Sequence, residues 1–280
     1  MLLKAAVFVV FLKLILWDLF LRCSSIDERL SITHDEFANS NELKFLAQNR
    51  LDLIGYEDKY INFSRLDDPL LIEHTKRILD KSCGEYVDVI IFMISSPDNT
   101  HLRESHRNVI GNQRIKSESR TLKNKYRHCF VYTVGYSGKE YLDEYVDTES
   151  LRFSDIIRIP LVESYYNLPK KVSTSLAVLN HFKDRFEYVL KTDDDTVIKT
   201  NILIPMIFSE FRKFDIVGYV KEAPCVIRHE NDKFYMSKDD MSSDHFHSHP
   251  QGGGYIIRSS VVKGIILISS TTQHITNLKT

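Results

Sequence analysis

From residue 86 onward, short apolar runs alternate with patterns typical of helices. Four runs have strand length and are rich in β-branched or aromatic residues: residues 87–94, 129–134, 156–161 and 188–192. Residues 170–182 instead repeat apolar side chains at helical spacing. Because strands and helices alternate, we predict an α/β domain with a mainly parallel sheet flanked by helices. Such sheets bind ligands beyond the carboxyl ends of their strands.

The N-terminus carries a different hydrophobic pattern. Residues 5–21 are apolar except for Lys13 and Asp18, and their length suits the short end of a roughly 30 Å hydrocarbon core. We predict a signal-anchor transmembrane helix there, with residues 1–4 as a cytoplasmic tail. The alternatives are a cleaved signal peptide ending near residues 23–25 and a buried amphiphilic helix. Residues 22–85 are predicted to form a stem and linker, and residues 86–280 the catalytic domain.

Charge and cysteine usage narrow the class of protein. Lys and Arg number 37 against 38 Asp and Glu, for a formal net charge of -1. This balance provides no basic excess, so we expect no nucleic-acid partner. The four cysteines show no CxxC spacing, which disfavours a zinc or redox motif. They are compatible with an oxidising compartment, although their pairing cannot be read from the sequence.

The strongest chemical signal is the acidic triplet Asp193, Asp194 and Asp195, directly after the apolar run 188–192. Three adjacent carboxylates repel one another, and a bound cation is the simplest compensation at a strand end. Carboxylate oxygens suit hard ions such as Mg²⁺ or Mn²⁺, which also bridge to phosphate oxygens. A solvated acidic turn is the alternative. Residues 196–199 lack the later ligands of a calcium loop.

The triplet and its surroundings resemble the KxDDDxF motif of the β1,3-galactosyltransferase and β1,3-N-acetylglucosaminyltransferase-like family, glycosyltransferase family 31. Other stretches resemble family motifs in the same order: residues 101–110, 155–157, 163–171, 215–219 and 249–255. Two positions depart from the family pattern. Gly111-Asn112 stands where Thr-Trp is usual, and Pro169 stands where Thr is usual.

This resemblance implies a GT-A-type, Rossmann-like fold and a UDP-sugar donor with a divalent cation, usually Mn²⁺. It implies inverting transfer of a hexose or N-acetylhexosamine, in β1,3 linkage, to a glycan acceptor on a glycoprotein or glycolipid. The expected location is the Golgi membrane, single-pass type II, with the catalytic domain in the lumen. The membrane contact would be made by residues 5–21.

The resemblance also assigns site residues. Asp195, together with Asp193, is expected to contact the metal. The predicted cofactor-binding residues are Arg103, Arg107, Lys171, Lys191, Asp193, Asp194, Gly253 and Gly254. The glycine triplet 252–254 is interpreted by default as a turn that needs positive φ.

The catalytic base is not assigned. In relatives an acidic motif follows the glycine-rich segment, but no Asp or Glu occurs between Gly252 and Thr280. The alternatives are a C-terminally incomplete domain, a catalytically inactive homologue that binds nucleotide sugar or a partner protein, or a base drawn from Asp239, Asp240 or Asp244. For an incomplete domain we expect residues 261–268 to form a helix that exposes apolar surface. The nearby histidines 245, 247 and 249 are interpreted as a solvated loop rather than a metal cluster.

Overall fold

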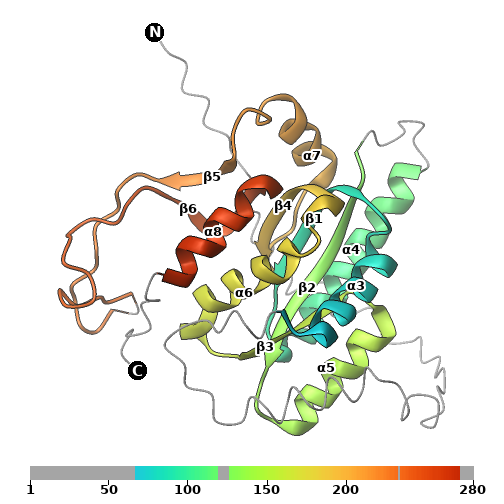
Figure 1. Cartoon of the computed structure of the whole chain (residues 1–280), viewed down its shortest axis with the longest axis horizontal. Helices are drawn as coiled ribbons and strands as arrows, with labels where there is room; N and C mark the ends of the chain where they lie inside the picture. Colours follow the sequence, from blue (N-terminus) through green and yellow to red (C-terminus); the bar gives the residue numbers. More distant parts are fainter. Residues whose placement is uncertain (1–66, 119–125, 233, 272–280) are drawn as a thin grey trace, which may run out of the picture.

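The computed structural model describes residues 67–118, 126–232 and 234–271. These residues form one six-stranded sheet with the order β3-β2-β1-β4-β6-β5 (Figure 1). The strands are β1 (Val87–Ile94), β2 (His128–Tyr136), β3 (Ile156–Val162), β4 (Phe186–Asp193), β5 (Ile216–Lys221) and β6 (His249–Arg258). Strands β1 to β4 pair in parallel, whereas β6 is antiparallel to both β4 and β5. The predicted mainly parallel α/β sheet is confirmed.

Helices cover both faces of the sheet. They are α3 (Pro69–Ser82), α4 (Thr100–Glu118), α5 (Glu140–Phe153), α6 (Leu168–Asn180), α7 (Thr200–Ser209) and α8 (Ser259–Thr271), joined by 3-10 turns at Pro97–Asn99, Tyr165–Asn167 and Lys183–Arg185. Helices α3, α6 and α8 share one apolar cluster, and α5 and α7 share the cluster on the opposite face. Helix α4 joins that second face through His106, which contacts Met93. Two layers of helices therefore enclose the central strands β1, β2 and β4, whereas β5 at the edge of the sheet is largely exposed.

The four predicted strands are all present, each at or within two residues of its expected ends. They were predictable because strands buried on both faces read as continuous apolar runs. In β1, seven of the eight side chains are buried, and Asp88 is half-buried. The predicted helix 170–182 corresponds to α6, which begins two residues earlier with Pro169 in its first turn.

Helix α3 lies inside the range predicted to form stem and linker, and it packs against β2 and β3. The Asp68 carboxylate caps it by accepting a hydrogen bond from the Leu70 N–H at 2.9 Å. Its inner face buries Leu71, His74, Thr75, Ile78 and Leu79, which belong to one helical stripe. A disulfide from Cys83 to Cys129 then joins the end of α3 to β2. The packed domain therefore begins before residue 86.

Among the C-terminal elements, the glycine triplet differs from its prediction. The glycine triplet does not form the expected turn; it lies within β6, and Gly254 pairs with Thr192 of β4. In the described part of the chain only Gly84 and Gly138 have positive φ among glycines. Residues 261–268 are helical, as predicted, within α8: Val262 is buried while Leu267 and Ile268 are exposed.

The membrane-anchor prediction falls outside this structure. Among the described residues, no helix has both the length and the hydropathy needed to span a bilayer. Residues 1–4, 5–21 and 22–66 lie outside the described ranges.

Candidate functional site

The acidic triplet lies at the carboxyl end of two adjacent parallel strands. Asp193 is the last residue of β4 and is in register with Ile94, the last residue of β1. Beyond the strand the chain turns: the Asp194 N–H donates to the Ile94 carbonyl at 3.2 Å, and the Thr196 N–H donates to the Asp193 carbonyl at 3.2 Å. This is the edge at which sheets of this kind bind ligands.

The three carboxylates have different environments. Asp195 is exposed, and its carboxylate accepts a long hydrogen bond of 3.3 Å from the Thr196 hydroxyl. The Asp193 side chain is 35% exposed. Asp194 is 7% exposed and accepts a hydrogen bond from the Asn99 amide at 2.9 Å. Asp193 and Asp195 therefore present oxygens to solvent, whereas Asp194 is bound to the loop after β1.

Lys191 links the triplet to the glycine-rich strand. Its ammonium is almost fully buried and donates to Asp193 Oδ1 at 2.5 Å and to the Gly252 carbonyl at 2.6 Å. The Thr192 hydroxyl also donates to the Gly253 carbonyl at 3.4 Å. The predicted residues Lys191, Asp193, Gly253 and Gly254 are thus brought together at one edge of the sheet.

Tyr255 follows these glycines and was not among the predicted site residues. It pairs with Lys191 across the β4–β6 ladder. Burial, followed by the nearby charge of Asp193, raises the pKa of the Tyr255 phenol to about 12. Gly218 on β5 faces it closely, because an added Cβ would lie 3.0 Å from Tyr255 Cβ and 3.1 Å from Pro250 Cβ. The phenol therefore stays protonated and can act as a hydrogen-bond donor beside Asp193.

Arg103 and Arg107 do not present free guanidinium groups to a ligand. Arg103 is 0% exposed and pairs with Glu149 at 2.6 Å. Arg107 pairs with Glu149 and with Asp155, both at 2.7 Å. The resemblance implies cofactor contacts for both arginines. In the structure their guanidinium groups are engaged by Glu149 and Asp155, and charges enclosed in this way need such internal partners.

Lys171 also lies behind the surface. Its ammonium donates to the Ser95 carbonyl at 2.5 Å and pairs with Glu163, whose carboxylate accepts the Gly135 N–H at 2.6 Å. Burial lowers the pKa of Lys171, while the charge of Glu163 opposes this effect. The structure therefore gives Lys171 a role at the end of β1 that the family motif alone did not reveal.

The candidate bases lie elsewhere, in the arm formed by the outer parts of β5 and β6 with residues 222–248 (Figure 1). Asp240 accepts a hydrogen bond from the Ser237 hydroxyl at 2.5 Å. Asp244 pairs with Lys238, and this hydrogen bond lowers the pKa of its carboxyl group. A carboxylate stabilised in its charged form is a weaker proton acceptor, so the structure does not favour Asp244 as the base. Asp239 is exposed.

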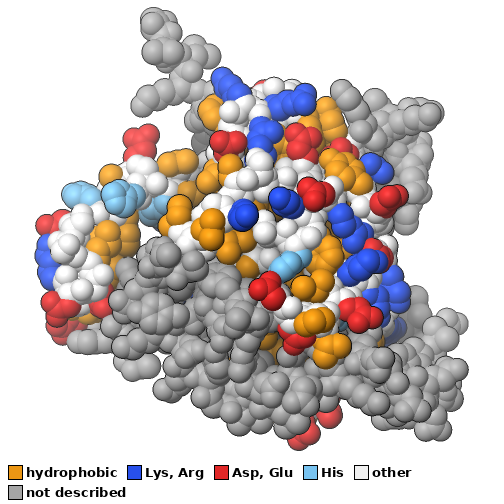
Figure 2. Space-filling view, viewed as in Figure 1, with side chains coloured by type: hydrophobic (Ala, Val, Ile, Leu, Met, Phe, Trp, Pro, Cys, Tyr) orange, Lys and Arg blue, Asp and Glu red, His pale blue; other side chains and the backbone are white. Residues whose placement is uncertain are grey.

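Histidine side chains gather on the same arm, as Figure 2 shows. His245 Nδ1 lies 3.0 Å from the Ala223 carbonyl, and His249 Nδ1 lies 2.7 Å from the His247 carbonyl. Across the described ranges, no group of three His, Cys, Asp or Glu side chains is arranged to hold a metal ion. His245 and His247 are exposed and His249 is half-buried.

Comparison with known proteins decides the family. The family model described as Galactosyltransferase matches residues 105–278, which include the triplet and β6. The chain belongs to the galactosyltransferase family.

Individual members of the galactosyltransferase family are distant relatives. The chain is 24% identical to beta-1,3-galactosyltransferase 5 of Pan troglodytes over 203 residues, covering 71% of this chain and 65% of the relative. It is 25% identical to beta-1,3-galactosyltransferase 2 of Mus musculus over 204 residues, covering 70% of this chain and 47% of the relative. The chain thus matches slightly less than two thirds of the first relative and about half of the second.

Proposed function

We propose that the protein transfers a hexose or N-acetylhexosamine from a UDP-sugar to a glycan acceptor, in β1,3 linkage and with inversion. The observation that carries this proposal is the pair of accessible carboxylates, Asp193 and Asp195, at the carboxyl edge of a galactosyltransferase-family sheet. The names of the relatives support the β1,3 linkage. A Golgi location, with residues 5–21 as the anchor, belongs to the same proposal.

The side chains present fit a divalent cation that shares its ligands with a diphosphate. Asp193 and Asp195 offer hard oxygen donors of the kind that Mn²⁺ or Mg²⁺ prefers. Lys191 donates to Oδ1 of Asp193 and leaves Oδ2 for another partner. When bound, such an ion would neutralise charge that develops on the UDP leaving group. Two protein carboxylates leave coordination positions for phosphate oxygens.

The protein's own residues would orient the donor. Lys191 fixes Asp193 and the Gly252 carbonyl in one arrangement, and Tyr255 holds a protonated phenol beside them. Gly252 and Gly253 carry no side chain, and a Cβ at either would meet nothing within 4 Å. The strand therefore leaves open space beside the triplet, where a nucleotide diphosphate can approach the backbone closely.

The test is isothermal calorimetry of the full chain with Mn²⁺ and UDP, followed by assay of UDP release from UDP-galactose and UDP-N-acetylglucosamine. We expect UDP binding that depends on Mn²⁺, and turnover of one donor when a glycan acceptor is supplied. Binding without turnover of any donor would favour the inactive homologue that only holds nucleotide sugar. If a folded sample binds neither Mn²⁺ nor UDP, both functions are rejected.

A further inference from the structure

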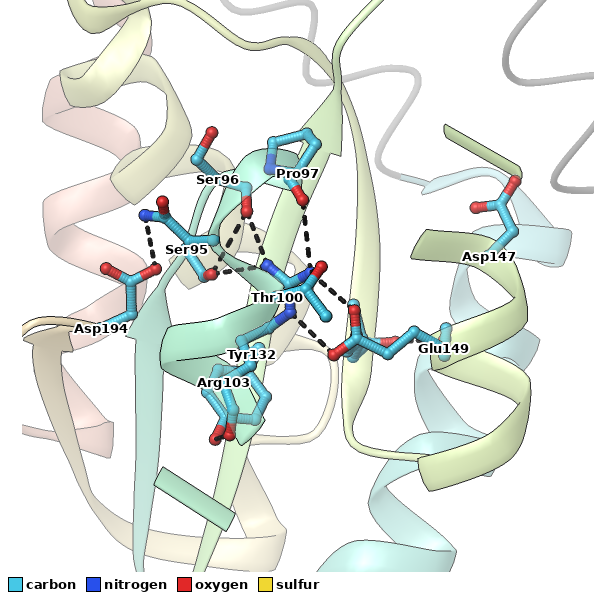
Figure 3. Close-up of polar contacts among 12 residues, drawn as sticks. Ser95, Ser96, Pro97, Thr100, Arg103, Tyr132, Asp147, Glu149 and Asp194 are labelled. Carbon is cyan, nitrogen blue, oxygen red and sulfur yellow. Dashed lines mark hydrogen bonds and ion pairs between the residues drawn. The ribbon is translucent and has the colours of Figure 1, made fainter. Parts of the chain in front are cut away.

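A continuous set of polar contacts runs from helix α5 to the middle aspartate of the triplet (Figure 3). It begins at Glu149, passes through Arg103 to the loop after β1, and ends where Asn99 donates to Asp194 Oδ2 at 2.9 Å. These residues are far apart in sequence: 46 residues separate Arg103 from Glu149, and 95 separate Asn99 from Asp194. The fold therefore brings a support to the triplet that its own sequence neighbours do not provide.

Arg103 is the centre of this support. Its guanidinium donates to both Glu149 oxygens at 2.9 and 2.6 Å, so the ion pair is bidentate. The same group donates to Ser95 Oγ at 2.8 Å, the Ser96 carbonyl at 2.6 Å, the Pro97 carbonyl at 3.4 Å and Thr100 Oγ1 at 2.9 Å. A planar fork with several fixed acceptors holds a loop in one geometry, which a lysine ammonium could not reproduce.

The same loop is held from the opposite side of the strand. Lys171 donates to the Ser95 carbonyl at 2.5 Å, so a second buried cation binds the residue that follows β1. Asn99 ends the 3-10 turn Pro97–Asn99, and its N–H donates to the Ser96 carbonyl at 3.0 Å. The Asn99 amide is thereby presented to Asp194 from a loop fixed on both faces of the sheet.

Asp194 is correspondingly unlike its neighbours. Its side chain is buried and is bound by the Asn99 amide of the β1 loop, whereas Asp195 is exposed. Asp194 is the middle residue of the turn that follows β4, so the Asn99 contact fixes the backbone that carries both Asp193 and Asp195. A change in the Asn99 contact should therefore alter both metal-facing carboxylates.

We propose that Asn99, fixed by the Arg103–Glu149 pair, is a positioning residue that holds Asp194 out of the metal site and aims Asp193 and Asp195 at the cation. This inference rests on the proposed function, because it presumes that the triplet binds a divalent ion. Asn99 acts through Asp194 and does not itself touch the substrate.

The experiment measures Mn²⁺ affinity of the full chain by calorimetry with UDP present, without any assay of turnover. Asn99→Leu removes the amide donor at similar volume, and we expect a Mn²⁺ dissociation constant about 10-fold higher, because partners that orient metal ligands typically contribute 10–100-fold. Asp194→Asn keeps an acceptor for Asn99, so it should weaken Mn²⁺ binding far less than Asp195→Asn does.

The matched control is Asn167→Leu. Like Asn99, Asn167 is half-buried at the end of a 3-10 turn, but its amide donates to the Val162 carbonyl at 3.0 Å rather than to the triplet. The two leucine variants should have similar thermal midpoints but different Mn²⁺ affinities. Equal Mn²⁺ affinity in both, with normal binding by the wild type, overturns the role of Asn99 alone; absence of Mn²⁺ binding by the wild type rejects the proposed function as well.

A second pair of variants tests the support itself. Arg103→Lys and Arg158→Lys each alter a fully buried arginine that pairs with an acidic residue of α5. Both should lower the thermal midpoint, but only Arg103→Lys should also weaken Mn²⁺ binding. Parallel losses of Mn²⁺ affinity in the two variants would show a general effect of destabilisation and contradict the proposal.

Discussion

Two regions of the molecule carry many charged groups: the carboxyl end of strands β1 and β4, and the β5–β6 arm. They differ in how far these charged side chains are exposed to solvent. At the carboxyl end, Arg103 and Glu149 are removed from solvent and each charge meets a partner in a defined geometry. On the arm, Lys238 and Asp244 remain exposed, with side chains 58% and 69% accessible. Exposed ion pairs contribute little to stability, whereas breaking a buried pair is costly.

This difference indicates where charge has a structural role in the protein. Charges that must be held in place, at the edge where Asp193 and Asp195 lie, are buried and multiply bonded. On the arm, Arg228 is half-buried and donates to four backbone carbonyls of the arm. Lys238 and Asp244 differ, because they keep their charges in water, where small rearrangements have little cost, and Tyr219 is 60% exposed. The arm therefore has the properties of an adaptable surface, and the carboxyl edge those of a preorganised one.

The largest effect should come from Glu149→Ala. This change leaves Arg103 and Arg107 without their shared carboxylate in a buried setting, which typically costs about 3–5 kcal/mol. Urea unfolding at pH 7 measures the loss. Glu144→Ala, at an exposed position on the same helix, should change the free energy of unfolding by no more than about 0.5 kcal/mol. An equal loss of unfolding free energy in the two variants would contradict the difference proposed between buried and exposed charges.

Asp195→Asn should act on binding rather than on folding. Asp195 is exposed and has few internal contacts among the described residues, so its loss should leave the thermal midpoint nearly unchanged. If it contacts the metal, Mn²⁺ affinity with UDP present should fall by about 100-fold or more, beyond what positioning groups contribute. Calorimetry decides this, and unaltered Mn²⁺ affinity would remove Asp195 from the predicted site.

His74, a buried residue of α3, extends the comparison to the face of the sheet that α3 shares with α6 and α8. Burial lowers its pKa from 6.5 to about 4, and its ring Nε2 accepts the Arg158 N–H at 3.3 Å, which requires the neutral ring. The unfolded chain binds the proton on His74 more readily than the folded chain does. The contribution of the neutral ring to the free energy of unfolding is therefore fully present above the unfolded pKa and is lost as the pH falls from 6.5 toward 4. Between pH 7 and pH 5 the loss is about 2 kcal/mol.

The measurement is urea unfolding of the wild type and of His74→Gln at both pH values. The variant should lose most of this pH dependence, although its stability at pH 7 will also fall if the contact to Arg158 is weakened. If the pH dependence is the same in both proteins, another group is responsible for it.

The smallest effect should follow Lys238→Met on the arm. It removes the shorter of two ion pairs to Asp244, where both Lys238 and Asp244 are exposed, and water replaces the lost contact. Urea unfolding should give the same midpoint as the wild type within error. A clear decrease would show that the arm, too, depends on fixed ion pairs.

Sequence alone was sufficient for the central strands and for the location of the triplet. Buried parallel strands leave a direct pattern of apolar runs, and a polar group after such a run must lie at the carboxyl edge. Helix α5 was not anticipated, because its buried face carries Asp143, Asp147 and Glu149, which conceal the usual amphipathic pattern. The resemblance placed Arg103 at a ligand, and no pattern in the sequence indicated another partner for it. Only the fold shows that Glu149, distant in sequence, lies beside Arg103.

The conformation of the glycine triplet and the packing of α3 could not be predicted from the sequence, for related reasons. Glycine is compatible with both a turn and an extended strand, and pairing with β4, distant in sequence, selects the strand. Helix α3 has a detectable apolar stripe, but its packing on the domain depends on contacts with β2 and β3 that come later in the chain. The Cys83–Cys129 pairing was likewise open until the fold placed the two residues 5.1 Å apart, measured between their Cα atoms.

That disulfide sets a lower limit on the part of the protein that can fold independently. It closes a covalent ring across 46 residues, and this ring contains β1, the Ser95–Asn99 loop and α4. Closing a ring of this size removes conformational freedom from the unfolded chain worth about 4 kcal/mol. A fragment starting at residue 86 would lack Cys83 and α3 and would leave Cys129 as an unpaired thiol. The loop that contacts Asp194 would then no longer lie inside a covalent ring.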